Sequence, residues 1–238
     1  MYTEFIEMHK EDKRNNKMKI GIVHTSVTET EEFEIEETIQ RVFGQKVEFY
    51  VQSNPHIINS IDSIENIPSV AVADIVKMYM NAVCERCDII LSACVIASTV
   101  CDKAQELSKM IKTPIISIES GMCKEAVRIG KRIGILGTIP TSVESVKKKI
   151  ETLQKNNLDG EIITYFVESN VGTDKKVLDE RVLHAAKDIA NRVDVILLAQ
   201  GSIAHTADDI SLKTGKPVLG SVEYAAKNLK EVLDMYNV

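Results

Sequence analysis

The sequence predicts an α/β protein with two pseudo-symmetric lobes from an internal duplication, each a four-stranded, mostly parallel sheet flanked by helices. From residue 18 onward, short apolar runs rich in Val and Ile alternate with segments of helical periodicity, a pattern typical of βαβ units. The second observation is that this series occurs twice. The third is that each half supplies four strands and four helices, so each half can form a complete sheet.

The strands are justified by their short apolar runs, which are rich in Val and Ile. They are expected at residues 19–24, 47–52, 88–93, 114–118, 132–137, 161–167, 194–199 and 217–221. Helices follow from the 3.6-residue periodicity between the strands, near residues 30–43, 69–86, 99–112, 120–130, 141–156, 175–192, 203–214 and 222–236. Each helix provides the crossover that a parallel strand pair requires.

The duplication is visible in three pairs of strands that match in the same order. The segment 20–25, Ile-Gly-Ile-Val-His-Thr, matches 133–138, Ile-Gly-Ile-Leu-Gly-Thr. The segment that ends at Cys94, Asp-Ile-Ile-Leu-Ser-Ala-Cys, matches the segment that ends at Gln200, Asp-Val-Ile-Leu-Leu-Ala-Gln. Thr-Pro-Ile-Ile at 113–116 matches Lys-Pro-Val-Leu at 216–219. Such a repeat predicts two similar lobes whose strand carboxyl ends face one cleft.

Composition and charge narrow the class of protein. The 238 residues are 44% hydrophobic and 27% charged, which excludes a disordered chain. The formal net charge is −6 and no basic stripe occurs, so nucleic acid is not an expected partner. No apolar run is long enough to cross a bilayer, and residues 1–17 are a polar N-terminal extension without the apolar centre of a signal peptide, so we expect a cytoplasmic protein with no membrane partner.

Five cysteines, an odd number, lie in the middle of the chain, which is typical of free thiols in a reducing compartment. Cys94 ends a buried strand and precedes a helix, where unpaired backbone N–H groups stabilise a thiolate that can act as base or nucleophile. The alternative is a small buried hydrophobic residue. Cys84 and Cys87 form a Cys-x-x-Cys, but they lie at the other end of that strand, so redox or zinc chemistry is not favoured.

Polar residues after the strands are the candidate ligand groups. Hydroxyls that follow the first strand of each half favour an anion such as a carboxylate, although Ser and Thr there also serve as helix caps. His24 is either a general acid or a buried structural histidine, and Glu119 is either a base or a capping carboxylate. No glycine-rich nucleotide motif is present. The candidate substrate-binding residues are His24, Thr25, Asn54, Val95, Ile96, Thr138, Thr141, Gln200, Gly201 and Ser202, with Ser26 and Ser142 nearby.

These segments resemble the aspartate/glutamate/hydantoin racemase superfamily from about residue 19 to 236. The resemblance is carried by residues 20–25 and 88–94, by Gly-Lys-Arg-Ile-Gly-Ile-Leu-Gly-Thr at 130–138, and by residues 195–202 and 215–219. It implies a cofactor-independent enzyme without a metal, in which two cysteines flank the acidic carbon of a small carboxylate. One cysteine removes a proton and the other returns one from the opposite face. It also implies a homo-oligomer, usually a dimer.

The resemblance further implies how the lobes are assembled. The last strand of each half is expected to join the other lobe, so lobe 1 contains residues 18–112 plus 217–238 and lobe 2 contains residues 113–216. The two chain ends, apart from the extension, would then share one lobe.

The chain departs from the family pattern at two positions. Gln200 occupies the position of the second cysteine, and an amide cannot shuttle a proton at neutral pH. Val95 and Ile96 follow Cys94, where racemases carry polar residues. The sequence is similar to a single-cysteine branch that includes malonate decarboxylases. Our first hypothesis is a racemase-like or isomerase-like carbon-acid enzyme with Cys94 as acid/base, and the alternatives are a decarboxylase or lyase on the same scaffold and a non-catalytic carboxylate-binding protein.

Overall fold

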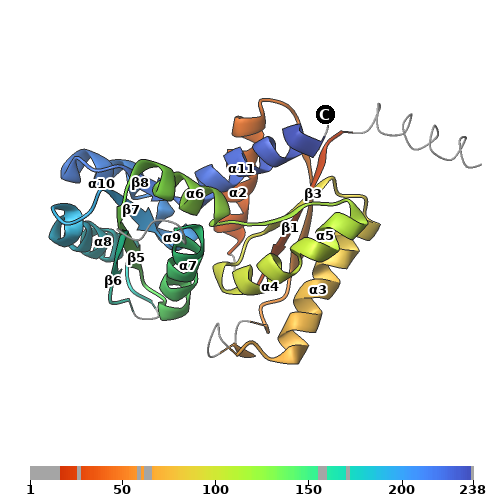
Figure 1. Cartoon of the computed structure of the whole chain (residues 1–238), viewed down its shortest axis with the longest axis horizontal. Helices are drawn as coiled ribbons and strands as arrows, with labels where there is room; N and C mark the ends of the chain where they lie inside the picture. The colour runs from red at the N-terminus through yellow and green to blue at the C-terminus, as the bar shows by residue number, and fades with distance from the viewer. Residues whose placement is uncertain are drawn as a thin grey trace, which may run out of the picture.

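A computed structural model describes residues 17–25, 28–57, 60–61, 66–154, 160–169 and 172–236 (Figure 1). The N-terminal extension expected at residues 1–17 therefore lies outside the described residues except for Lys17, and Ser26 lies outside them as well. No helix in the described part of the chain is both long and apolar enough to span a membrane.

The described residues form two sheets of four parallel strands, as predicted. The first contains β1 (Lys19–His24), β2 (Glu48–Ser53), β3 (Ile89–Ser92) and β4 (Ile115–Ser117), and the second contains β5 (Arg132–Gly137), β6 (Glu161–Phe166), β7 (Val195–Leu198) and β8 (Val218–Gly220). The strand orders are β2-β1-β3-β4 and β6-β5-β7-β8. In both sheets the order along the sheet is second, first, third and fourth strand of that half, so the two lobes have the same topology, as the sequence duplication predicts.

The helices alternate with these strands at the expected places. Their bounds are α2 (Glu29–Phe43), α3 (Ser69–Cys84), α4 (Ser98–Lys103), α5 (Gln105–Ile111), α6 (Ser120–Ile129), α7 (Pro140–Leu153), α8 (Lys175–Ala190), α9 (Gly201–Ala204), α10 (Ala207–Thr214) and α11 (Ser221–Tyr236). Two predicted helices are each divided, 99–112 into α4 and α5 and 203–214 into α9 and α10. A 3-10 turn, η2 (Val95–Ala97), precedes α4, so helical structure begins directly after Cys94.

Equivalent aspartates join the start of the first strand to the start of the third strand in both lobes. The backbone N–H of Lys19 donates to Asp88 Oδ2 at 2.9 Å, and that of Arg132 donates to Asp194 Oδ2 at the same distance. In the second lobe the Arg132 guanidinium also donates to Asp194 Oδ1, from Nη2 at 2.6 Å. These hydrogen bonds, chiefly those from the Arg132 side chain, lower the pKa of Asp194 to about 2.

We expect Asp194→Asn to lower the free energy of unfolding at neutral pH by about 1 kcal/mol, since solvent screens this partly exposed pair. A depressed carboxyl pKa contributes stability above the unfolded value of ~3.9, and that contribution is lost as the pH falls through the folded value. Urea unfolding of wild type and variant at decreasing pH measures the difference. If the difference in unfolding free energy between wild type and variant stayed constant as the pH fell, the stabilisation would not come from the ionised Asp194 carboxylate.

The predicted exchange of strands between the lobes is wrong. β4 pairs with β3 and β8 pairs with β7, so each last strand stays in the sheet of its own half. The helices that follow these strands are exchanged instead. α6 packs against α7 and β7 of the second lobe, and α11 returns to pack against α2 and β3 of the first lobe (Figure 1).

The exchanged helices join the two lobes through a shared hydrophobic core. This core contains sheet residues of both lobes, such as Ile20 and Ile133, together with buried residues of α6 and α11. The two helices cross so closely that a Cβ atom on Gly121 would lie 2.1 Å from the carbonyl oxygen of Tyr224. Separate cores fill the outer face of each sheet, under α3 in the first lobe and under α8 in the second.

Candidate active site

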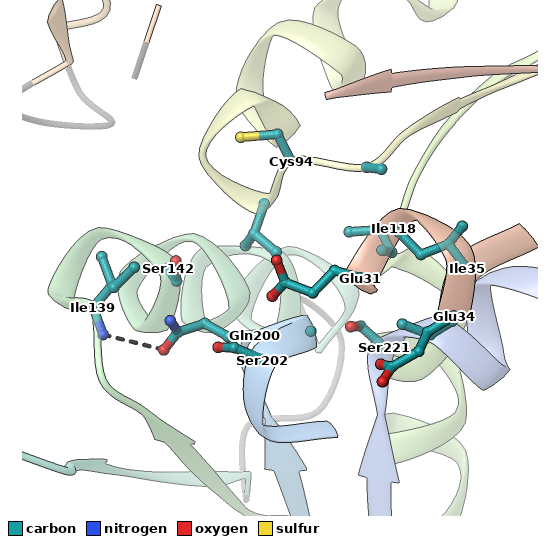
Figure 2. Close-up of a pocket in the computed structure, with 14 residues that line it drawn as sticks. Glu31, Glu34, Ile35, Cys94, Ile118, Ile139, Ser142, Gln200, Ser202 and Ser221 are labelled. Atoms are coloured by element: carbon teal, nitrogen blue, oxygen red, sulfur yellow. Dashed lines mark hydrogen bonds between the residues drawn. The ribbon is translucent and has the colours of Figure 1, made fainter. Parts of the chain in front are cut away.

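A cavity of about 330 Å³ lies between the lobes at the carboxyl ends of the strands (Figure 2). Its walls come from the start of α2, from the segments after β3, β4, β5 and β7, and from the start of α11. The lining residues are Glu31, Glu34, Ile35, Ala93, Cys94, Val95, Ile118, Ile139, Ser142, Gln200, Gly201, Ser202, Ser221 and Val222. This is the cleft that the duplication predicts, because parallel strands place their carboxyl ends at one edge of each sheet.

Cys94 lies directly after β3 at the N-cap position of η2 and is 8% exposed. The hydroxyl of Thr25, which follows β1, donates a hydrogen bond to Cys94 Sγ over 2.8 Å. β1 and β3 are adjacent in the sheet, which brings these two strand ends together. A hydrogen bond donated to sulfur favours the thiolate over the thiol. Cys94 therefore has the position and the polar contact expected of an acid/base thiol.

The segment that carries Cys94 is held by the other lobe. Ser145, on α7, donates from its Oγ to the carbonyl oxygen of Val95 over 2.9 Å. The side chain of Lys149, one turn further along α7, is 3.4 Å from Ser98 Oγ at the start of α4. The position of the thiol thus depends on the packing of the two lobes.

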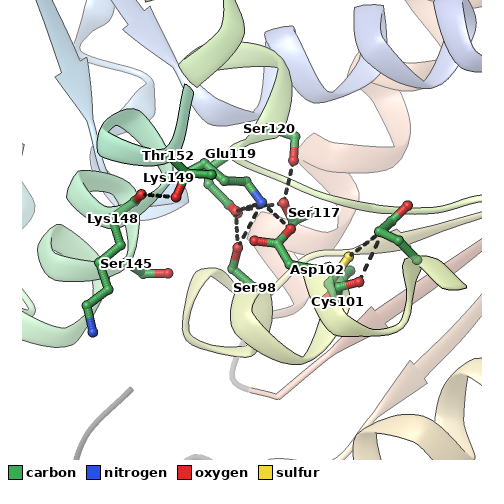
Figure 3. A network of polar contacts seen from close by, with 12 residues as sticks. Ser98, Cys101, Asp102, Ser117, Glu119, Ser120, Ser145, Lys148, Lys149 and Thr152 are labelled. Carbon is green, nitrogen blue, oxygen red and sulfur yellow. Dashed lines mark hydrogen bonds and ion pairs between the residues drawn. The ribbon is translucent and has the colours of Figure 1, made fainter. Parts of the chain in front are cut away.

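Lys149 also belongs to a buried polar network between the lobes (Figure 3). Its ammonium forms ion pairs with Asp102 and with Glu119, the latter at 3.5 Å. Glu119 is fully buried, and its Oε1 accepts hydrogen bonds from Ser98 and from Ser117. Burial lowers the pKa of Lys149, but the carboxylates of Glu119 and Asp102 outweigh burial and raise that pKa above its ordinary value.

From the sequence, Glu119 was expected to be either a base or a helix-capping carboxylate. It is a buried member of an ion-pair network and does not line the cavity.

Gln200 occupies the wall contributed by the second lobe. Its Oε1 accepts hydrogen bonds from the backbone N–H groups of Thr138 and Ile139, at 2.5 and 3.1 Å, and from the Thr138 hydroxyl. Because N–H groups require an acceptor, these contacts fix the orientation of the amide and leave its NH₂ group available to a ligand. A Cβ atom on Gly137 would lie 3.2 Å from this oxygen, so glycine keeps space for the amide there.

The structure brings six of the predicted site residues together at the cavity or next to it. Cys94, Val95, Gln200, Gly201 and Ser202 line the cavity, and Thr25 contacts the thiol. The backbone of Ile96 lies in η2, but its side chain is outside the part of the structure that is described.

The other predicted residues do not line the cavity. His24 is buried and its Nε2 pairs with Glu32 at 3.1 Å, which agrees with a structural role. Asn54 accepts from the backbone N–H of His56, and the Thr138 hydroxyl is bound to Gln200. Thr141 lies in the first turn of α7, where Ser142 lines the cavity in its place.

Several lining residues were missed by the sequence analysis. Ile118 directly follows β4, and Ser221 directly follows β8. Ligands bind just after the carboxyl ends of parallel strands, so the same rule applied to the last strand of each half predicts both residues. Glu31 and Glu34 lie among other glutamates on α2, and their pattern resembles an ordinary solvated helix face. No sequence signal distinguishes them from their neighbours.

The other four cysteines are free and lie away from the cavity walls. Burial raises the pKa of Cys87 to about 11 and raises those of Cys101 and Cys123. Cys84 is exposed. Among the described residues, no group of three or more His, Cys, Asp or Glu side chains is arranged to hold a metal ion.

Comparisons with known proteins match the chain to one family and to solved structures of the same fold. The family described as Asp/Glu/Hydantoin racemase matches residues 20–229. No curated protein sequence matches the chain significantly.

Solved structures of several enzymes share the fold at low sequence identity. Allantoin racemase from Klebsiella pneumoniae is 15% identical with a TM-score of 0.69, over 92% of this chain and 89% of that chain. Glutamate racemase RacE1 from Bacillus anthracis is 15% identical with a TM-score of 0.65, over 92% and 82%. Unliganded arylmalonate decarboxylase is 10% identical with a TM-score of 0.62, over 91% and 93%.

Proposed function

Because the chain belongs to the Asp/Glu/hydantoin racemase family, we propose that it is a cofactor-independent carbon-acid enzyme of the racemase or isomerase type. It acts on a small carboxylate or amino acid in the inter-lobe cavity, and Cys94 is the acid/base. The observation that carries this proposal is the Cys94 thiol, which lines the cavity and accepts a hydrogen bond from Thr25.

The reaction begins when the Cys94 thiolate removes the proton from the carbon next to the substrate carboxylate. The C–H bond breaks, an S–H bond forms, and the electron pair moves onto the carboxylate oxygens. The NH₂ group of Gln200 stabilises the developing negative charge. The thiol then either exchanges its proton with solvent and returns one to the same carbon, or delivers its proton to another carbon of the delocalised anion, and the thiolate is regenerated.

Gln200 limits this chemistry because a carboxamide is neither an acid nor a base at neutral pH and so cannot transfer a proton to the substrate carbon. With one thiol, removal and return of the proton take place on one face, which gives isomerisation or exchange without inversion. The same observation favours a second candidate, a decarboxylase in which Cys94 protonates the carbanion left by loss of CO₂. Both reactions use the same thiol and the same cavity.

Gln200→Glu separates the acceptor role of this side chain, which is to bind backbone N–H groups, from the donor role proposed for its NH₂ group. The carboxylate still accepts from the backbone N–H groups of Thr138 and Ile139, but the NH₂ donor becomes a negative charge that repels a substrate carboxylate. We expect KM to rise by about tenfold or more. Steady-state kinetics measures the change, and circular dichroism checks that the variant is folded. An unchanged KM would show that Gln200 does not contact the substrate.

Alkylation by iodoacetamide distinguishes an enzyme from a non-catalytic binding protein. We expect Cys94 to react faster than exposed Cys84, and Cys87, Cys101 and Cys123 to remain unmodified because burial raises their pKa values. Mass spectrometry of peptides from the native protein identifies each site. Cys94 labelling slower than that of Cys84 would count against catalysis and favour the binding protein.

A further inference from the structure

All the charged side chains among the described residues that line the cavity are acidic. Glu31 and Glu34 project from the first turns of α2, and none of the described lining residues is Lys, Arg or His. Figure 2 shows the Glu31 carboxylate extending toward the wall formed by Gln200 and Ser202. These two carboxylates give the cavity a negative potential, which concentrates cations and repels anions.

Glu31 is fixed in this position by a capping box at the start of α2. Its Oε2 accepts hydrogen bonds from the backbone N–H and the hydroxyl of Thr28, both at 2.9 Å. Its Oε1 faces the other lobe, because a Cβ atom on Gly201 would lie 4.0 Å from it. No described residue donates to Oε1, so the oxygen is available to a ligand that spans the cleft.

Ser221 supplies an independent sign of a ligand on another wall. Its side chain is 0% exposed, lines the cavity, and its Oγ has no hydrogen-bond partner among the described residues. Buried hydroxyls are nearly always hydrogen-bonded, so an unpartnered one at a cavity wall indicates a missing partner. Ser221 is also the first residue of the 16-residue helix α11, whose first N–H groups favour an anion.

We propose that Glu31 and Glu34 form a cation subsite that selects a ligand bearing a protonated amine. The ammonium group of the ligand lies against the two carboxylates, and its carboxylate contacts the Ser221 hydroxyl and the Gln200 NH₂ group. Dicarboxylates without an amine are excluded, because a second anionic group would meet like charges with no compensating cation. This inference rests on the proposed function only for the location of the ligand.

Matched six-carbon probes test the subsite by binding to the wild-type protein. Norleucine carries one ammonium group and lysine carries two, 2-hydroxyhexanoate has a hydroxyl in place of the α-ammonium, and adipate carries two carboxylates and no ammonium. The three-carbon set of 2,3-diaminopropionate, alanine, lactate and malonate repeats the comparison at smaller size. Isothermal titration should show each amine binding at least about tenfold more tightly than the hydroxy acid of equal length, with the dicarboxylate weakest.

Glutamine variants assign the effect to the two carboxylates. Glu31→Gln and Glu34→Gln should each weaken binding of the amines by about tenfold and leave binding of the hydroxy acids unchanged or stronger. Gln at the third helix position still satisfies a capping box, so Glu31→Gln keeps the start of α2. The matched control is Glu29→Gln, which removes a first-turn charge that does not line the cavity.

Several outcomes would overturn the subsite: a dicarboxylate that binds as tightly as the amines, failure of all the amines to bind, or equal weakening by Glu31→Gln and Glu29→Gln. Cys94-dependent turnover of a dicarboxylate would overturn the subsite and leave the proposed function intact. Selective binding of amines with no Cys94-dependent chemistry would support the subsite and remove the proposed function.

Discussion

The Cys94→Ser variant should catalyse proton exchange at the substrate carbon about 10² to 10⁴ times more slowly than the wild type. A serine hydroxyl has nearly the size of the thiol and still fits beside Thr25, but it does not ionise near neutral pH. The variant therefore retains the cavity and loses the base. Initial rates at saturating substrate measure the effect, and substrate affinity should change little.

The control for this variant is Cys84→Ser. Cys84 is exposed at the end of α3, at the opposite end of β3 from Cys94, so its replacement should leave the rate unchanged. A Cys94→Ser protein that is folded and keeps more than about a tenth of the wild-type rate would assign the proton transfer to another group.

Lys149→Met should lower the free energy of unfolding by about 3 to 5 kcal/mol, the largest stability effect expected of a single substitution in the inter-lobe network. The ammonium of Lys149 is the cation that faces fully buried Glu119, and without it that carboxylate is left uncompensated. Because the pKa of Lys149 is raised, its stabilisation is fully present below the unfolded pKa and is lost only as the pH rises through the folded value. Urea unfolding at neutral pH therefore measures the whole effect.

A double variant tests the electrostatic origin of this loss. Adding Glu119→Gln to Lys149→Met removes the uncompensated charge, so stability should recover by at least half of what the single substitution costs. If Lys149→Met fails to fold, the double variant and Lys149→Arg provide the comparison, since Arg keeps the positive charge. A double variant no more stable than the single one would show that packing of α7 sets the stability.

Most of the fold could be predicted because the sequence patterns that indicate it lie within short segments of the chain. Apolar runs and helical periodicity place the strands and helices, and the repeated segments identify the two lobes. Which sheet a strand joins is not a local property. β4 is short and buried on both faces, so its residues suit either sheet, and the structure assigns it to the first lobe. The exchange expected of the strands occurs in α6 and α11, which cross at Gly121.

The candidate site could be predicted only where a residue lies at a strand end. Cys94 and Gln200 were found because each follows a buried strand in a repeated segment. Thr138 was expected to bind substrate, but its hydroxyl donates to Gln200, a contact between loops distant in sequence. Glu31 could not be recognised, since its place at the cavity depends on the tertiary structure that brings Gly201 of the second lobe opposite the start of α2.

Proton NMR in D₂O tests the central claim most directly. Small carboxylates and amino acids, each in both hands, are incubated with the wild-type protein and with Cys94→Ser, and the Cα–H signal, the configuration and the carboxylate are followed. We predict that the wild type exchanges Cα–H for deuterium without inversion, or protonates the product of CO₂ loss, and that Cys94→Ser does neither. Ligand binding without exchange or decarboxylation in the wild type, or equal exchange by Cys94→Ser, would contradict the assignment of Cys94 as the acid/base.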